Sequence, residues 1–426
     1  MGKCYSDAVE RALGYLYYHE TERKGQEALE LLKQASEAGD GDATCVLARC
    51  MCGSQYVWEG HGFPDNGKEA ARLLHRSVEQ GSALGVLVSL RSGELPEFRE
   101  RKMPFSSIQE AFDIVLEKAK QGDAFSQYTI GNSYFWWDFL RIQGKGQNSF
   151  SSHEEFKAYL KQNIEQCEDW FWKAFRGGMY LAGNNLRYYY TNGDEDIILP
   201  QPEKAEPIAR MGAEYGYPYY EKEYGRELLK QKRADEGMMW LKKAADHGEV
   251  SANYYIGQAY YLGKGVEENN TLAIEYLQKA LNASDGGMGS HNLLGEIYYQ
   301  GFGVEPDYAK AFGLLSWAYE RGSTWGVNYL GRCCFYGRGT QQDYVRARQM
   351  LEQIDGTPKA EELYMLGYIY GNGLGVEADI PKAVAYLQKA GNFGPAVEEL
   401  RNYKKTFFTG KWVLLREKND KQFQKE

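Results

Sequence analysis

The chain has 426 residues, of which 43% are hydrophobic, and it carries 59 acidic against 50 basic residues, a net charge of −9. The acidic balance argues against nucleic acid as a partner, because binding to phosphates depends on an excess of Lys and Arg. The sequence contains no apolar leader and no run of 18 apolar residues, so we expect a cytoplasmic protein without an integral membrane segment.

The first residues contain a short modification pattern. Met1-Gly2 followed by Ser6 matches the N-myristoylation signal, and Cys4 is placed for a second acyl chain. Such a short pattern arises often by chance. An unmodified terminus is therefore the expectation, and a lipid anchor at Gly2 is the alternative.

Residues 1–250 carry divergent copies of a helical repeat. Two copies show a small residue followed three positions later by an aromatic ring on an apolar helical face: Leu13-Gly14-x-x-Tyr17 and Ile130-Gly131-x-x-Tyr134. Second helices alone are visible at 70–81, 111–122, 205–216 and 238–248. The segment 192–202, with its Gly, Asp and Pro residues, predicts a longer loop.

One of these copies holds an insertion near 135–166. In that copy 43 residues separate Gly131 from the closing Ala174, whereas 23 separate Gly257 from Ala280 in a regular copy. The inserted residues are rich in aromatic rings: Trp136, Trp137, Phe139, Phe150, Phe156 and Tyr159. These rings are either ordinary core or a functional lid or docking surface, since long insertions in compact repeats are often functional.

Residues 251–392 contain four regular copies. In each copy a glycine inside a helical pattern is followed six residues later by Gly-x-Gly. The helix glycine recurs at Gly257, Gly295, Gly331 and Gly367, at spacings of 38, 36 and 36 residues. A fixed period between about 20 and 50 residues is typical of a repeat solenoid.

Each regular copy predicts two helices joined by a tight turn. Gly257 lies on the apolar face of the first helix, which indicates that a neighbouring helix comes too close for a Cβ atom. Gly263 and Gly265 can take positive φ, so the first helix is expected to end there. The N-cap of the second helix is predicted at the same position of every copy: Asn269, Asp307, Asp343 and Asp379.

Beyond Gly391 the period ends. Residues 396–404 are predicted as a final helix, and the apolar residues between Phe407 and Leu415 are expected to cover the end of the last repeat. Solenoids need such terminal caps. Residues 393–426 are therefore interpreted as a C-terminal capping helix and tail.

The motifs resemble those of the Sel-one-like repeat family, which is related to the tetratricopeptide repeats. The shared elements are Leu-Gly-x-x-Tyr, Gly-x-Gly-Val, Asp and Lys-Ala, and they are cleanest at 294–318 and 366–390. The copy around Gly331 departs from the pattern at Cys334 and Thr340. The resemblance implies an all-α fold, a right-handed α/α superhelical solenoid of about ten helix-turn-helix repeats. It also implies a non-catalytic scaffold or adaptor that binds other proteins.

In the related tetratricopeptide repeats the first helices line a concave groove. The resemblance therefore implies that a partner protein or peptide binds at the positions three before, one after and four after the helix glycine. In this chain they are Tyr254, Gln258, Tyr261, Asn292, Glu296, Tyr299, Asn328, Arg332, Phe335, Tyr364 and Tyr368. Asparagines can hydrogen-bond a peptide backbone while tyrosines supply contact area. The alternative is that these residues are solvated or pack between repeats.

The sequence offers no strong catalytic motif. The six histidines are scattered, and Gly-x-Gly lies between two helices, whereas dinucleotide and phosphate loops require a preceding strand. No Gly-x-Ser-x-Gly nominates a serine nucleophile. We expect no catalytic residues. The alternative function is an enzyme or enzyme regulator with a small-molecule pocket near the insertion 135–166.

The cysteines are seven in number and have no recurring spacing. We expect them to be free thiols that pack as small apolar side chains in a reducing compartment. The alternative is a metal cluster of Cys45, Cys50, Cys52 and His61, but this spacing matches no standard zinc pattern. We therefore expect neither a metal nor a cofactor.

Overall fold

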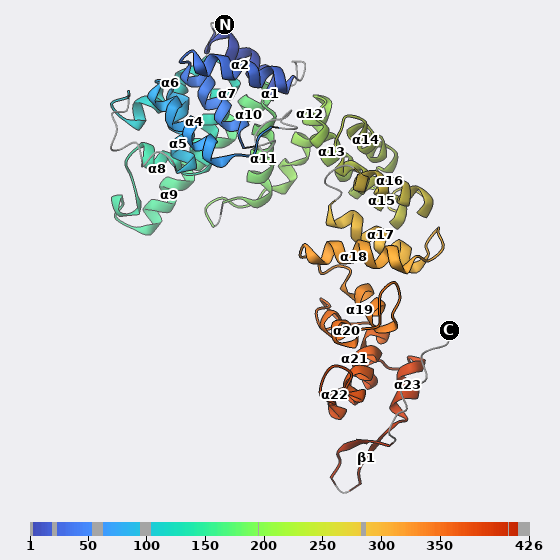
Figure 1. Cartoon of the computed structure of the whole chain (residues 1–426). Coiled ribbons are helices and arrows are strands. Elements are labelled where there is room, and N and C mark those ends of the chain that lie inside the picture. Colours follow the sequence, from blue (N-terminus) through green and yellow to red (C-terminus); the bar gives the residue numbers. More distant parts are fainter. Residues whose placement is uncertain are drawn as a thin grey trace. The chain divides into compact units, whose positions relative to one another are not determined.

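The computed structural model describes residues 3–18, 24–52, 63–93, 104–194, 196–282, 287–407 and 409–415. The acylation position Gly2 and the candidate metal ligand His61 lie outside these residues. The chain divides into two compact units, Met1–Tyr224 and Gly225–Glu426. Both are built almost entirely of helices, which confirms the predicted all-α repeat fold (Figure 1).

The first unit consists of helices that pack in antiparallel pairs. The pairs are α1 (Asp7–Tyr17) with α2 (Gly25–Glu37), α3 (Gly41–Cys50) with α4 (Gly67–Glu79), α5 (Ala83–Ser92) with α6 (Ile108–Lys120), α7 (Ala124–Phe135) with α10 (Gln166–Arg176), and α11 (Tyr180–Asn192) with α12 (Glu206–Glu214). A short 3-10 helix, η4 (Pro202–Lys204), precedes α12 after the predicted loop.

The insertion of the first unit lies between α7 and α10. It contains α8 (Asp138–Ile142), the 3-10 helix η3 (Gln147–Ser149) and α9 (His153–Ile164). Phe139 and Phe156 are buried, and the rings of Phe150 and Tyr159 pack at a centroid distance of 4.9 Å. Trp136, by contrast, leaves 51% of its surface exposed. Most of the inserted rings therefore pack as core.

The second unit contains the four regular copies. Helix α13 (Pro218–Lys230), which crosses the division between the units, and α14 (Ala234–Asp246) precede them. The copies are α15 (Ser251–Leu262) with α16 (Asn270–Asn282), α17 (Met288–Gln300) with α18 (Tyr308–Glu320), α19 (Val327–Tyr336) with α20 (Tyr344–Leu351), and α21 (Ala360–Asn372) with α22 (Ile380–Lys389). Figure 1 shows these pairs following one another along the unit. Counting α13 with α14, the described residues hold ten pairs, as predicted.

The helix glycine of each regular copy is a spacer between its two helices. A Cβ atom on Gly295 would lie 2.5 Å from Cγ of Leu315, and one on Gly367 would lie 2.7 Å from Cγ of Leu387. The copies at Gly257 and Gly331 make the same approach to a buried leucine of the second helix. The prediction that the helices come too close for a Cβ atom is confirmed.

The turn between the paired helices has one geometry in all four copies. In the second copy Gly301 takes the left-handed conformation at φ 74°, and the backbone N–H of Asp307 donates to the carbonyl of Tyr298 at 2.9 Å. The side chain of Asp307 then accepts from the backbone N–H of Lys310 at 2.9 Å. Equivalent caps at Asn269, Asp343 and Asp379 confirm the predicted helix starts.

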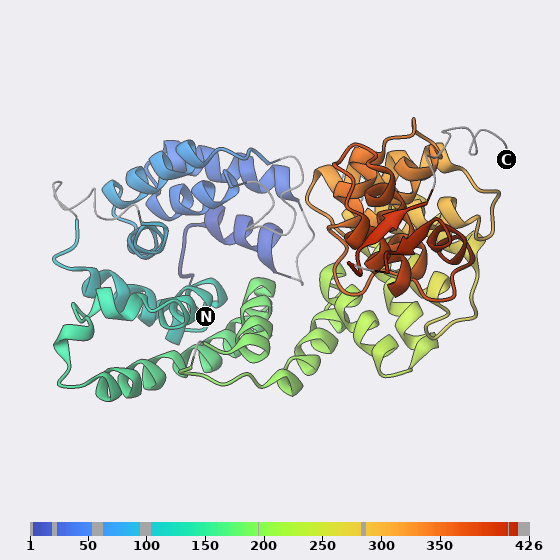
Figure 2. The same ribbon diagram turned by 90° about the horizontal axis from the view of Figure 1, so that it is seen from below.

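The C-terminal end differs from the prediction. Helix α23 (Gly394–Leu400) is shorter than the predicted 396–404, because Tyr403–Lys405 forms strand β1 and pairs antiparallel with β2 (Trp412–Leu414). The hairpin is the antiparallel ribbon that follows α23 (Figure 2). Trp412 and Leu414 pack against the core of the last copies, whereas Phe407 is 94% exposed. Only part of the apolar tail therefore covers the last repeat.

No helix among the described residues has the length and apolar character needed to cross a membrane.

Candidate functional site

The predicted partner-binding residues lie on α15, α17, α19 and α21, and we call them together the first-helix face. Asn292, Tyr299, Phe335 and Tyr364 are buried. The other members are half-buried: Tyr254, Gln258, Tyr261, Glu296, Asn328, Arg332 and Tyr368. Much of the face is therefore a layer between neighbouring repeats, and its role in partner binding stays a prediction.

One part of this layer is a chain of polar contacts from α15 to α19. The hydroxyl of Tyr329 donates to Oε1 of Glu296 at 2.6 Å, and Nε2 of Gln300 donates to the same hydroxyl at 3.3 Å. Burial raises the pKa of Tyr261, and the nearby Glu296 carboxylate raises it further. Glu296 is thus held from two sides, and its orientation is fixed within the layer.

An ion-pair cluster joins α19 to α21. Arg332 contacts Glu361 through Nη1 at 2.9 Å and Glu362 through Nη2 at 2.6 Å. Burial alone would lower the pKa of Arg332, but the two carboxylates raise it, so the guanidinium stays charged. Glu362 is only 1% exposed, and its Oε2 is buried without a hydrogen-bond partner among the described residues.

Next to the cluster, aromatic rings fill the space between the last two copies. The ring of Phe335 lies 5.4 Å from that of Tyr344, 5.7 Å from that of Tyr368 and 6.2 Å from that of Tyr364, measured between centroids. These edge-to-face contacts hold α19 and α21 together. Phe335 and Tyr364 therefore act as packing residues between the last two copies.

A cavity of about 600 Å³ opens where α19 and α21 begin. Asn328 and Glu362 line it, together with Trp325, which is 53% exposed in the turn before α19. Asp355 and Lys359 lie exposed on its rim. The cavity therefore brings polar and aromatic groups from two repeats to one place.

The two asparagines of the predicted face are not equivalent. Nδ2 of the buried Asn292 donates to Oγ of Ser323 at 2.7 Å, so this amide already has a structural partner. Asn328 is half-buried and makes no side-chain hydrogen bond to another described residue. Asn292 is therefore engaged within the layer between repeats, whereas Asn328 remains partly accessible.

Sequence reasoning missed Glu362, although a signal was present. It lies five residues before the helix glycine Gly367, where the other regular copies have Ala252, Ser290 and Gly326. All three small residues are buried. A carboxylate in place of a small buried residue is a departure that comparison of the copies would have found.

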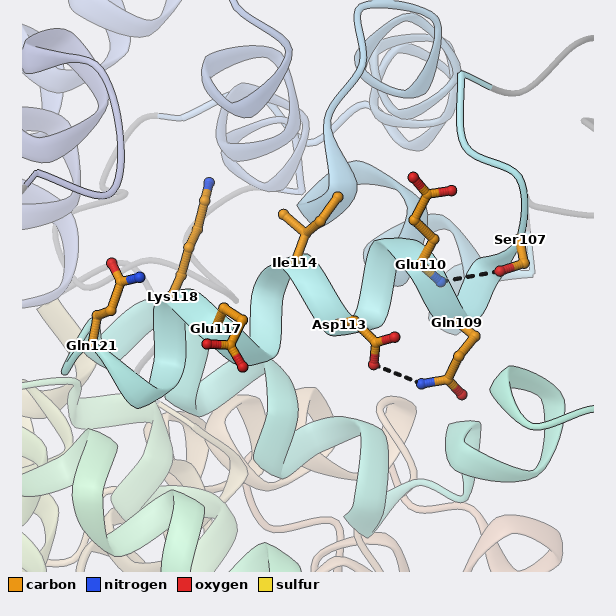
Figure 3. A pocket seen from close by; sticks show the side chains of 8 residues that line it. All are labelled: Ser107, Gln109, Glu110, Asp113, Ile114, Glu117, Lys118 and Gln121. Atoms are coloured by element: carbon orange, nitrogen blue, oxygen red, sulfur yellow. Dashed lines mark hydrogen bonds between the residues drawn. The ribbon is translucent and has the colours of Figure 1, made fainter.

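A second cavity, of about 540 Å³, lies beside α6 in the first unit. Figure 3 shows that its labelled side chains come from α6, its N-cap Ser107 and its C-cap Gln121. Gln109 donates to Asp113 at 2.8 Å, and the backbone of Glu110 donates to Ser107 at 3.1 Å. The described residues thus present one polar helix surface here, without converging groups from a second element.

The cysteines are free thiols, and the described residues hold no group of His, Cys, Asp and Glu side chains that could bind a metal. Cys45 and Cys50 are buried in the core of the first unit. Burial raises the pKa of Cys50 to about 12, which keeps this thiol neutral. Both thiols therefore pack as small apolar groups.

Comparison with known proteins supports the repeat assignment. The family model of the Sel1 repeat matches residues 9–40, 46–82, 176–206, 209–249, 250–285, 290–323, 326–354 and 363–392. Among curated proteins no sequence matches.

Two solved structures match the chain, and the first of them shares its fold. One is a protective antigen present in uropathogenic Escherichia coli strains that displays an SLR fold, with a TM-score of 0.53, 21% identity, and coverage of 92% of this chain and 78% of that one. The other is a Sel1 repeat protein from Oxalobacter formigenes, with a TM-score of 0.43, 20% identity, and coverage of 94% and 96%. Because the matched repeats span more than half of its length, the chain belongs to the Sel1 repeat family.

Proposed function

We propose that the chain is a non-catalytic scaffold or adaptor that binds a protein or peptide on the concave, first-helix face of its regular repeats. Sel1 and related repeats generally serve as protein-interaction scaffolds. The observation that carries the proposal here is the cavity beside Asn328, where a polar amide and an exposed ring lie together. The proposal places the scaffold in the cytosol, where its free thiols would stay reduced.

The chemistry of this cavity suits an extended peptide. The amide of Asn328 can donate and accept at once, and so can engage both polar groups of a peptide unit. The ring of Trp325 offers contact area that loses little conformational entropy on binding. The packing of Phe335 and Tyr364 between α19 and α21, the two helices that border the cavity, would keep these helices in a fixed arrangement before the partner arrives.

The proposal is tested by panning a random peptide library against the full chain and measuring the affinity of the selected peptides. Replacing Trp325 and Asn328 together by alanine should weaken binding roughly 5- to 150-fold, the equivalent of about 1–3 kcal/mol. Gln349→Ala is the matched control, because Gln349 is exposed on the second helix α20. Peptides that bind the double variant as well as the parent would show that the face is assigned wrongly.

One observation favours a second candidate, an enzyme or enzyme regulator with a pocket near the insertion 135–166. Trp136 and Tyr188 are both about half exposed, at 51% and 53%, and their ring centroids lie 6.5 Å apart. Native mass spectrometry of the purified chain tests this candidate. A bound metabolite that is lost in Trp136→Ala would support it over the scaffold.

A further inference from the structure

We propose that the cavity at the start of α21 accepts the ammonium group of a lysine side chain from the partner. This inference rests on the proposed function, because it names the part of a partner protein that the first-helix face would recognise. Its central group is the carboxylate of Glu362, and its second group is the ring of Trp325.

The first argument is the missing partner of Glu362. A buried carboxylate is costly unless its oxygens are hydrogen-bonded or paired. Arg332 contacts Oε1 of Glu362 through Nε at 3.2 Å and Nη2 at 2.6 Å, while Oε2 has no partner among the described residues. Glu362 lines the cavity, so a donor that enters it and displaces the atoms covering Oε2 would satisfy this second oxygen.

The second argument is that the repeat itself does not require a carboxylate here. The equivalent residues Ala252, Ser290 and Gly326 fill the same buried position in the other regular copies without any charge. The packing of α21 against its neighbours would therefore tolerate a small residue. Glu362 therefore adds a carboxylate at a position that the other regular copies fill with a small uncharged residue.

The third argument is the local balance of charge. The cluster joins one cation, Arg332, to two carboxylates, Glu361 and Glu362, and so keeps one negative charge in excess. On the rim, the negative charge of Asp355 and the positive charge of Lys359 sum to zero. Both side chains are exposed, so solvent screens their charges. The buried excess charge is therefore negative, and it attracts a cation.

The fourth argument distinguishes lysine from other cations. A guanidinium binds best to both oxygens of a carboxylate, but Arg332 already occupies one oxygen of Glu362. A compact ammonium can approach the single free oxygen and still donate to the carbonyl oxygen of Asn328. The exposed face of Trp325 can add a cation–π contact, and the half-buried Ile354 can contact the methylene stem.

The first experiment uses n-butylammonium, which reproduces a lysine side chain, and the uncharged n-butanol as its control. The full chain is labelled with 5-fluorotryptophan and observed by fluorine NMR. The resonance of Trp325 is identified as the one that is absent from the spectrum of Trp325→Phe. Butylammonium should shift this signal in a saturable way, and Glu362→Gln should weaken the apparent affinity about tenfold. Glu361→Gln is the matched comparison: it removes the same unit of charge from the cluster but leaves Oε2 of Glu362 in place, and Glu361 does not line the cavity, so it should weaken the affinity less than Glu362→Gln does. Circular dichroism checks that each variant is folded.

Three outcomes would overturn the inference: no shift of the Trp325 signal, an equal shift with butanol, or an unchanged affinity in Glu362→Gln. The selected peptides then separate the inference from the proposed function. Replacing the lysine of a selected peptide by norleucine should weaken its binding to the parent chain about tenfold. The Glu362→Gln variant should bind the lysine and the norleucine peptides equally well. Peptides that bind the first-helix face without needing lysine would refute the lysine site alone, and failure to select any peptide would refute both proposals.

Discussion

The spacer role of the helix glycines can be tested by adding a single methyl group. In Gly295→Ala the new Cβ would lie 2.5 Å from Cγ and 2.7 Å from Cδ2 of Leu315. Carbon atoms prefer about 3.5–4.0 Å, so the two helices or the leucine must move apart by about 1 Å. The variant therefore forces extra volume into a closely packed interface.

The magnitude follows from two opposing terms. Overpacking of this kind costs about 1–3 kcal/mol, whereas replacing glycine by alanine inside a helix stabilises it by about 1 kcal/mol. Gly313→Ala provides the matched control, because Gly313 is exposed in α18 and a Cβ there would meet nothing within 4 Å. Both variants gain the same stabilisation from replacing glycine by alanine inside a helix. Their free energies of unfolding should therefore differ by the cost of overpacking alone, about 1–3 kcal/mol.

Urea unfolding followed by circular dichroism measures this difference. Gly313→Ala should raise the midpoint, and Gly295→Ala should lower it or leave it unchanged. In a Leu315→Ala background the clash is removed, so Gly295→Ala should then be as favourable as the control. If Gly295→Ala raises the midpoint of the parent chain as much as Gly313→Ala does, the space beside Leu315 is adaptable and the spacer argument is wrong.

Three further predictions concern single contacts. Asp307→Ala should lower the stability by about 1 kcal/mol in thermal unfolding, while Asp307→Asn, an equally good N-cap, should cost little. Gly371→Ala should be destabilising because its Cβ would collide with the hydroxyl of Tyr403, and adding Tyr403→Phe should recover part of the loss; a strictly additive pair would contradict this contact. Arg332→Met leaves Glu362 buried without a cation and should cost about 3 kcal/mol, most of which the double variant with Glu362→Gln should regain in urea unfolding.

The parts of the fold that depend on neighbouring residues could be predicted from the sequence. Gly301 and Asp307 mark the turn because positive φ and an N-cap are local requirements. The spacer at Gly295 was also predictable, because its recurrence shows that the same helix contact is made in every copy. The difference between Asn292 and Asn328 was not predictable, since it depends on a contact with Ser323, which lies in the connection between α18 and α19.

The C-terminal hairpin shows a second limit of the repeat pattern. Four residues after the helix glycine the regular copies have Tyr261, Tyr299 and Phe335, but the last copy has Gly371. The hydroxyl of Tyr403, from the hairpin, lies against Gly371 and takes the space that an aromatic ring would fill. A departure from the repeat thus marks the place where another part of the chain packs.

The same reasoning applies to Glu362, with a different outcome. Like Gly371, it replaces the residue type that the other copies share at its position. At Gly371 the chain supplies the missing group itself, through Tyr403. At Glu362 the described residues partner only one of the two carboxylate oxygens: Arg332 holds Oε1, whereas Oε2 is buried without a hydrogen-bond partner, in a residue that lines a cavity. Because the chain does not supply this second partner, we propose that a group from outside the chain does so at the start of α21.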